Sequence, residues 1–233
     1  MAQTVLITGA SRGIGLALTQ EYLQRGAAVL ATCRRPASAG ALRDLAAGHS
    51  DRCRVIELDV DSAASASAAA DQADTTLDLL INNAAIGGPE GEGSVATLDV
   101  DAALATLRTN TLGPLRVAQA MRPLLAAGTN PRLVNISSGL GQMTGKTSVG
   151  SYIYGASKAA LNFVTLALAA EWRPAGVTVV AMSPGWVRTD MGGADAPLSP
   201  ASAAAGIATV IDRLTLDDTG QWFSHDGSRS ENW

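Results

Sequence analysis

One tyrosine and one lysine, Tyr154 and Lys158, lie four residues apart in a chain with only three tyrosines and two lysines. On a helix, positions i and i+4 share a face, so the phenol and the ammonium can point into the same cleft. A phenol ordinarily titrates near pH 10, and a neighbouring positive charge favours the phenolate. The pair therefore predicts a tyrosine that acts as a general acid or base near neutral pH.

A glycine-rich turn near the N-terminus predicts a nucleotide site. Thr4–Thr8 is an apolar run typical of a buried parallel strand, and Gly9–Gly15 (Gly-Ala-Ser-Arg-Gly-Ile-Gly) follows it directly, before an amphipathic stretch. Glycines allow a tight turn, and a helix N-terminus offers free N–H groups to a pyrophosphate. The spacing G-x-x-x-G-x-G differs from the common dinucleotide fingerprint, and a plain strand-to-helix turn is the alternative. The context of strand, turn and helix favours the phosphate site.

Several apolar runs predict an alternating α/β chain. Beyond Thr4–Thr8, the expected strands are Ala27–Thr32, Arg54–Leu58, Leu77–Ile81, Arg132–Ile136 and Val177–Met182. Helical patterns separate them, which indicates β-α-β units and a parallel sheet. The Ala/Ser-rich stretch Ser62–Ala73 is expected to form a surface helix because alanine is the best helix former.

Motifs along the whole chain resemble those of the short-chain dehydrogenases/reductases. They are, in order, Thr8–Gly15, Asn82–Ala85, Asn110, Ser138, Tyr154-x-x-x-Lys158 and Pro184-Gly185. The resemblance implies one α/β domain over residues 1–233, a Rossmann-type doubly wound parallel sheet with helices on both faces. Thr32–Arg35, Pro184–Gly193 and Phe223–Gly227 more narrowly resemble the branch that holds the carbonyl reductase Sniffer and the bacterial C-factor proteins.

The resemblance implies a role for each catalytic position. Tyr154 would donate a proton to the substrate oxygen, Lys158 would lower the pKa of Tyr154 and bind the nicotinamide ribose, and Ser138 would hydrogen-bond the same substrate oxygen. Ser138 is preferred over Ser137 because, as in the family, it precedes a glycine by three places. Asn110 would hold a water in a proton relay. The alternatives are a strand-end cap for Ser138 and a local backbone-bonding role for Asn110.

The end of the second expected strand favours NADPH over NADH. An NAD site usually places an acid there, whereas this chain has Arg34 and Arg35, and guanidinium groups suit a 2′-phosphate. Arg12 is expected to reach the same phosphate; a solvated arginine pair is the alternative. Asp59 resembles the adenine contact of the family, with a helix N-cap as the alternative.

The complete cofactor set implied by the resemblance follows the motifs, with Thr189 as the carboxamide contact. It comprises Gly9, Ser11, Arg12, Gly13, Ile14, Gly15, Arg34, Asp59, Val60, Asn83, Ala84, Tyr154, Lys158, Pro184, Gly185, Val187 and Thr189.

Two loops, 139–151 and 186–200, are expected to border the substrate. Ser138 and Tyr154 lie farther apart than is common in the family, and the extra residues fall in the first loop. Within the second, Val187–Ser199 is expected to close over the substrate. Apolar and aromatic side chains suit a hydrophobic aldehyde, ketone or quinone. The expected substrate contacts are Gln142, Tyr152, Trp186 and Met191.

Composition limits the partners. A net charge of −4 and a pI of about 5.1 argue against a nucleic-acid or acidic-membrane partner. No membrane-spanning run or leader is expected, and Cys33 and Cys53 form neither a disulfide framework nor a metal-ligand pattern, so we expect a cytoplasmic protein without a metal. The apolar stretch Ala159–Trp172 fits either the homo-oligomer interface implied by the resemblance or a buried core helix.

The leading interpretation is an NADPH-dependent oxidoreductase that reduces a small-molecule carbonyl. The alternative is a C-factor-like signalling protein, in which nucleotide binding matters more than turnover. A sugar-nucleotide epimerase is disfavoured because such chains usually carry an additional substrate domain.

Overall fold

The computed structural model describes residues 2–89, 92–144, 151–231 and 233. Its strands are β1 (Thr4–Ile7), β2 (Ala28–Cys33), β3 (Cys53–Glu57), β4 (Leu79–Asn82), β5 (Arg132–Ile136), β6 (Thr178–Ser183), β7 (Trp222–Ser224) and β8 (Arg229–Ser230). Its α-helices are α1 (Gly13–Gln24), α2 (Gly40–Ala47), α3 (Ala63–Ala73), α4 (Ala103–Leu107), α5 (Gly113–Ala126), α6 (Ile153–Trp172) and α7 (Pro200–Arg213). The six expected strands are confirmed to within two residues at each end.

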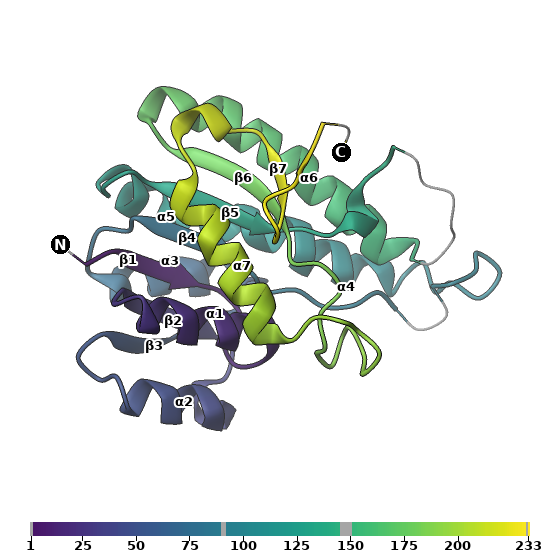
Figure 1. The fold of residues 1–233 in the computed structure, drawn as a ribbon. Coiled ribbons are helices and arrows are strands. Elements are labelled where there is room, and N and C mark those ends of the chain that lie inside the picture. Colours follow the sequence, from purple (N-terminus) through teal and green to yellow (C-terminus); the bar gives the residue numbers. More distant parts are fainter. Residues whose placement is uncertain (1, 90–91, 145–150, 232) are drawn as a thin grey trace.

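The strands form one sheet in the order β3-β2-β1-β4-β5-β6-β7-β8 (Figure 1). All neighbouring pairs are parallel except β7 with β8. The expected parallel sheet is therefore correct except at its last edge, where the short strands β7 and β8 carry too few residues for a periodic signal. Because the chain leaves β1 toward β2 and later returns to β1 through β4, the strand order reverses there, and such a reversal opens a ligand crevice at the carboxyl ends of the strands.

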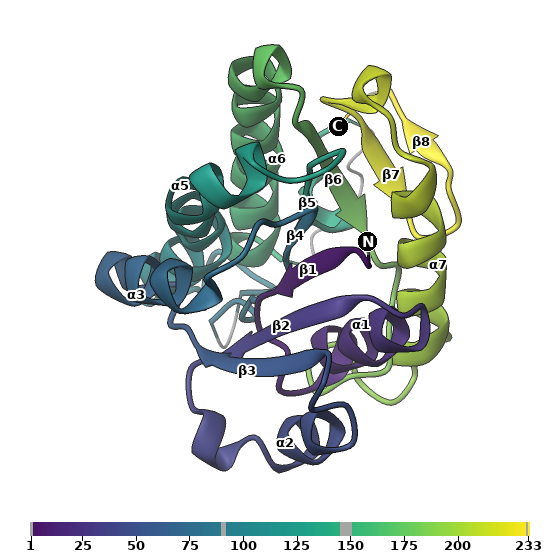
Figure 2. The same ribbon diagram turned by 90° about the vertical axis from the view of Figure 1, so that its left-hand side faces the viewer.

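Helices cover both faces of the sheet, which confirms the doubly wound α/β fold (Figure 2). Alternate side chains of β1 point to opposite faces, so Val5 and Ile7 join one core cluster and Leu6 joins the other. The first cluster lies under α1, α2 and α7, and the second lies under α3, α5 and α6. The two cores hold the strand ends that carry the candidate site.

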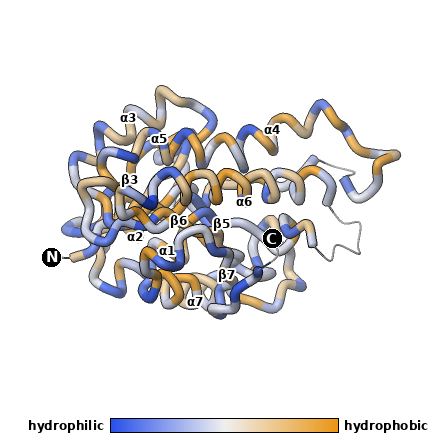
Figure 3. Tube along the Cα trace, turned by 90° about the horizontal axis from the view of Figure 1, so that it is seen from above, coloured by the Kyte–Doolittle hydropathy of each residue, from blue (hydrophilic) through white to orange (hydrophobic). Residues whose placement is uncertain are grey.

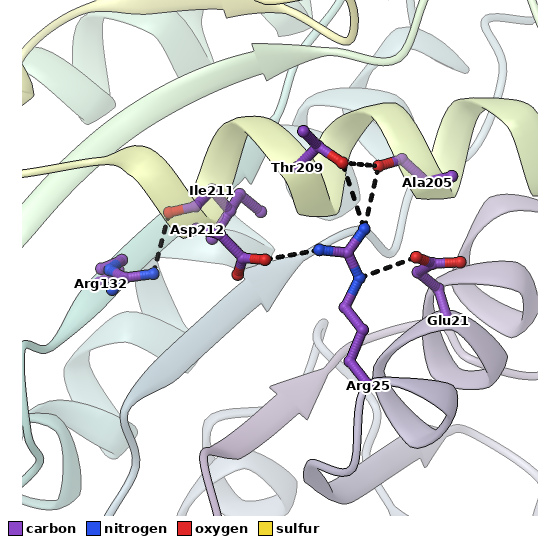
Figure 4. Close-up of polar contacts among 7 residues, drawn as sticks. All are labelled: Glu21, Arg25, Arg132, Ala205, Thr209, Ile211 and Asp212. Atoms are coloured by element: carbon purple, nitrogen blue, oxygen red, sulfur yellow. Dashed lines mark hydrogen bonds and ion pairs between the residues drawn. The ribbon is translucent and has the colours of Figure 1, made fainter.

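Arg25, directly after α1, joins that helix to α7 (Figure 4). Its guanidinium donates to Glu21 within α1 and to Asp212 and Thr209 on α7. Side-chain exposure of 30 % leaves the Arg25 guanidinium partly shielded from solvent. These bonds therefore fix α7, the helix that follows residues 186–200, against α1.

Two helices, α3 and α6, have an unusual composition. Ser62 caps α3 by accepting a hydrogen bond from the Ser65 amide at 3.2 Å, and the alanine stripe of α3 is buried, so the Ala/Ser-rich stretch is a helix as expected. Ile153–Ala175, which contains α6, is long and apolar enough to span a membrane by length and composition, contrary to the sequence expectation. Figure 3 shows its mostly apolar colouring. Leu168, Ala169 and Trp172 pack in the second core cluster, as in the core helix of a globular domain.

Candidate active site

The glycine turn between β1 and α1 is compact and fixed by the segment after β4. Gly9 and Gly13 adopt positive φ angles of 68° and 55°, a conformation that glycine tolerates. The Asn83 side-chain amide donates to the carbonyl oxygens of Thr8 at 2.9 Å and Gly9 at 3.3 Å. The Thr8 hydroxyl in return accepts from the amides of Asn83 and Ala84. The two motifs therefore form one rigid unit at the N-terminus of α1.

Gly15 leaves no room for a side chain. A Cβ at this position would lie 2.2 Å from the Gly9 carbonyl oxygen and 2.6 Å from the Asn83 amide nitrogen. Gly15→Ala must therefore displace the turn, and we expect the Kd for NADPH to rise at least about tenfold, because densely packed backbone cannot yield without cost. Fluorescence titration with NADPH measures this. Gly48→Ala is the control, since the nearest atom to its Cβ lies at 3.6 Å; an unchanged Kd in Gly15→Ala would contradict the expectation.

A cavity of about 990 Å³ lies at the carboxyl ends of the strands. It brings together most of the predicted cofactor residues, namely Gly9, Ser11, Arg12, Gly13, Ile14, Gly15, Arg34, Asp59, Val60, Asn83, Ala84, Tyr154, Lys158, Pro184 and Thr189. Gly185 and Val187 are not part of the lining. Val187 is buried and bridges to Leu198, and a Cβ on Gly185 would touch the Leu198 side chain at 2.7 Å, so both positions serve packing in this structure.

Positive charge gathers at the β2 end of the cavity. Arg34 and Arg35 are exposed and line it, and no carboxylate occupies their place after β2. Arg12 also lines the cavity, where its guanidinium contacts Asp190 at 2.6 Å. Both of these side chains are more than three-quarters exposed, so the pair is weak and Arg12 is free to exchange partners.

Asp59 lines the cavity and is not a helix cap. Its carboxylate accepts from the Asp61 amide at 3.0 Å, while Ser62 caps α3. The N-cap alternative is therefore wrong.

Ser138 and Tyr154 meet beside the other end of the cavity, whose lining includes Tyr154 but not Ser138. The Ser138 hydroxyl hydrogen-bonds the Tyr154 side chain, which lowers the pKa of the phenol, but burial has the larger effect and raises it. Ser138 also accepts from the Leu140 amide at 3.1 Å, so it caps a short turn as well. A Cβ on Gly141 would lie 2.8 Å from the Lys158 backbone, which explains why glycine stands three residues after this serine. Ser137 does line the cavity, and its hydroxyl donates to the Asn162 side-chain oxygen at 2.5 Å.

Lys158 is only 2 % exposed, and its ammonium donates to the Ile136 carbonyl oxygen at 2.8 Å. The ammonium lies 5.7 Å from the centre of the Tyr154 ring. Burial lowers the pKa of Lys158 to about 8. The expected lowering of the Tyr154 pKa by Lys158 is therefore not seen: burial raises the pKa of Tyr154, and the ammonium is directed to the backbone of β5.

Asn110 lies fully buried in a π-helical segment, Arg108–Leu112, between α4 and α5. Its side chain donates to the Ile86 carbonyl oxygen at 2.9 Å and to the Ser157 hydroxyl at 3.1 Å, and it accepts from the Ile86 amide at 2.9 Å. These bonds are nonlocal, so the local backbone-bonding alternative is wrong. Single π-helical turns often mark functional positions, and this one places Asn110 beside the residue that precedes Lys158.

The expected substrate residues are only partly brought together. Met191 lines the cavity, whereas Gln142, Tyr152 and Trp186 do not. Tyr152 and Trp186 are 40 % and 56 % exposed, and the Trp186 indole donates to the Gly192 carbonyl oxygen at 2.7 Å. Part of the first expected loop, 145–150, lies outside the described residues.

The second expected loop, 186–200, is held by hydrogen bonds between its own residues. The Arg188 guanidinium donates to the carbonyl oxygens of Ala196 and Pro197, both at 2.8 Å, and the Arg188 amide donates to Leu198. Sequence reasoning missed Asp61, Arg188 and Asp190 in the cavity lining. Asp190 adjoins the predicted Thr189, which is a usable signal, whereas no spacing in the sequence marks Asp61.

These features together define the site of a nucleotide-dependent oxidoreductase. They are the glycine-rich turn, the basic end of β2 and the cluster of Ser138, Tyr154 and Lys158, all carried by one doubly wound sheet. The short chain dehydrogenase family profile matches residues 3–197, so the chain belongs to this family. It is 40 % identical to the C-signal protein of Myxococcus xanthus over 154 residues, which are 65 % of this chain and 90 % of that protein.

Two solved structures are similar over nearly the whole chain. The carbonyl reductase Sniffer of D. melanogaster superposes with a TM-score of 0.93 at 31 % identity and covers 100 % of both chains. An NADPH-bound carbonyl reductase from chicken fatty liver superposes with a TM-score of 0.91 at 32 % identity, covering 100 % of this chain and 99 % of that one. The fold expected from the motifs is confirmed, and so is the resemblance to the Sniffer and C-factor branch.

Proposed function

We propose that this protein reduces a small-molecule carbonyl compound to an alcohol with NADPH. The observation that carries the proposal is a cavity with Tyr154 and Lys158 at one end, where Tyr154 also meets Ser138, and with the glycine turn and Arg34 at the other end. A dinucleotide is long enough to connect two such ends, and the carbonyl reductases that this chain resembles include one with bound NADPH.

The residues present fit the dinucleotide. A Cβ at Gly15 would collide with the turn, as a backbone cradle for a pyrophosphate requires. Gly9–Gly15 would hold the pyrophosphate, Arg12 and Arg34 the 2′-phosphate, and Lys158 and Thr189 the nicotinamide half. When bound, NADPH supplies the hydride that is added to the carbonyl carbon.

The protein's own residues supply the proton and the orientation. Tyr154 donates its phenolic proton to the carbonyl oxygen as negative charge develops there, and Ser138 donates a hydrogen bond to the same oxygen. Because burial raises its pKa, the phenol stays protonated at neutral pH, as an acid in the reduction direction must. Lys158 lies on the next turn of α6, and Asn110 holds the segment beside it through Ser157.

Removing two guanidiniums should weaken the preference for NADPH. We expect Arg12→Ala combined with Arg34→Ala to lower the ratio of kcat/KM for NADPH to that for NADH at least about tenfold, because charge-assisted contacts to phosphate are lost. Steady-state kinetics with both nucleotides measures the ratio. Arg122→Ala, on the exposed side of α5, is the control. An unchanged ratio in the double variant would show that Arg34 is simply solvated.

Oxidation of NADPH at 340 nm with a panel of aldehydes, ketones and quinones tests the function. Turnover that disappears in Tyr154→Phe supports the reductase. The similarity to C-signal favours a second candidate, a signalling protein in which nucleotide binding matters more than turnover. Tight NADPH binding without turnover of any member of the panel would favour that candidate.

The substrate class is inferred from apolar side chains in the two expected substrate loops. Met143 and Trp186 lie in these loops outside the cavity lining and are 72 % and 56 % exposed, while Met191 lines the cavity. Exposed apolar surface of this kind suits a hydrophobic carbonyl compound. The free, buried cysteines Cys33 and Cys53 accord with a cytoplasmic location. Phe163, 73 % exposed on α6, accords with pairing of two copies through that helix.

A further inference from the structure

A carboxylate from a distant segment covers the start of the catalytic helix. Glu92 lies between β4 and α4, and its side chain accepts hydrogen bonds from the Ser151 hydroxyl at 2.8 Å and from the Ile153 and Tyr154 amides, both at 3.0 Å. The Ser151 hydroxyl in turn accepts from the Gly155 amide at 3.3 Å. The first amides of a helix have no partners within it, and a negative charge is favoured at that end.

The segment that carries Glu92 is itself anchored to the catalytic machinery. Asn110 binds both backbone groups of Ile86, and the Thr106 hydroxyl donates to the Gly87 carbonyl oxygen at 3.1 Å. A Cβ on Gly88 would lie against the Glu92 carboxylate, so the glycine leaves room for this side chain in its present position. Asn110 and Thr106 therefore fix Ile86 and Gly87, while the Glu92 carboxylate binds the start of α6.

We propose that Glu92 is a positioning residue for the catalytic tyrosine, fixing the first turn of α6 so that the Tyr154 phenol meets Ser138. The inference rests on the proposed function, because it assigns a purpose to the position of Tyr154. Tyr154 is bound at its amide, and its hydroxyl is bound by Ser138 from the end of β5. Loosening the amide end tilts the phenol away from the serine, and misplacement of a reacting group lowers the rate steeply.

Glu92 also acts on Tyr154 through its charge. Two charged groups among the described residues face this phenol, Glu92 from the β4–α4 segment and Lys158 from α6, while Ser138 contributes a neutral hydroxyl. The Glu92 carboxylate raises the pKa of Tyr154. Removal of this charge lowers that pKa, so the protonated acid is lost at a lower pH and the reduction rate falls earlier on the alkaline side.

Glu92→Gln tests the inference because it retains the length of the side chain and removes the charge. We expect kcat for carbonyl reduction to fall about tenfold, as expected for loss of charge-assisted hydrogen bonds, with the Kd for NADPH unchanged. The alkaline limb of kcat against pH should move to lower pH. Asp101→Asn, an exposed acid on the same segment, should match the wild type in all three measurements.

Three results would overturn the inference: a wild-type kcat in Glu92→Gln, a lower kcat with an unmoved alkaline limb, or loss of NADPH binding, which would indicate a structural role alone. If Glu92→Gln does not fold, Glu92→Asp replaces it. This variant retains the charge but shortens the reach, so a lower kcat with an unmoved limb supports the inference, and a wild-type kcat overturns it. Activity that survives Tyr154→Phe would instead refute the proposed function, independently of Glu92.

Discussion

Tyr154→Phe is expected to lower kcat for carbonyl reduction by about 10²- to 10⁴-fold, the usual contribution of a positioned general acid. The substitution removes one hydroxyl from Tyr154, which lines the end of the cavity, and this hydroxyl hydrogen-bonds Ser138. The glycine turn and Arg34, which would hold the other end of the nucleotide, are untouched. NADPH should therefore bind with a nearly unchanged Kd while turnover disappears, as measured by fluorescence titration and by oxidation at 340 nm.

Tyr22→Phe is the matched control for this experiment. Tyr22 is fully buried on α1, and its hydroxyl has no hydrogen-bond partner in the described structure. Loss of an unpaired buried hydroxyl is neutral or stabilising, and α1 packs this ring away from the cavity, so kcat should match the wild type. Substantial turnover in Tyr154→Phe, alongside normal turnover in Tyr22→Phe, would remove Tyr154 from the mechanism.

Lys158→Met is expected to stabilise the nucleotide-free protein while it abolishes activity. Burial lowers the pKa of Lys158 from 10.5 to about 8, which corresponds to about 3 kcal/mol of destabilisation at neutral pH. The methionine leaves the Ile136 carbonyl oxygen without its donor, which costs roughly 1–2 kcal/mol. The net gain in the free energy of unfolding at pH 7 is therefore roughly 1–2 kcal/mol, measured by urea denaturation.

The pH dependence of stability provides a sharper test of the same residue. The folded-state pKa of Lys158 lies below its unfolded value, so the unfolded chain binds more protons between pH 8 and pH 10.5. The free energy of unfolding of the wild type should therefore rise across this window relative to that of Lys158→Met, and the difference between the two should be constant below pH 8. A constant difference across the whole pH range would show that folding does not lower the pKa of Lys158.

A stabilising effect of Lys158→Met would show that the wild-type chain retains a lysine that lowers its free energy of unfolding. The ammonium is held in a nearly dry position by one backbone carbonyl, 5.7 Å from the centre of the Tyr154 ring. A surface position would remove the cost of burial but would also remove the lysine from the cavity.

Much of the site could be predicted from the sequence because it depends on short-range spacing. Tyr154 and Lys158 share a face of one helix, and the glycines follow β1 directly, so local geometry alone brings each group together. The strands β1 to β6 are largely apolar runs, which their short length and composition mark as buried strands. The absence of an acid after β2 is likewise a local fact. The sequence by itself therefore determined the fold class, the position of the glycine turn and the shared helix face of Tyr154 and Lys158.

The tertiary structure decided the features that depend on contacts between distant segments. Glu92 meets Tyr154 across 62 residues and Arg12 meets Asp190 across 178, and no spacing rule relates either pair. Val187 lies outside the cavity lining because it bridges to Leu198. Strand β7 has only three residues, and it forms because it pairs with β6. The pKa of Lys158 also lies in this class, because desolvation depends on everything packed around a charge and not on its neighbours in the chain.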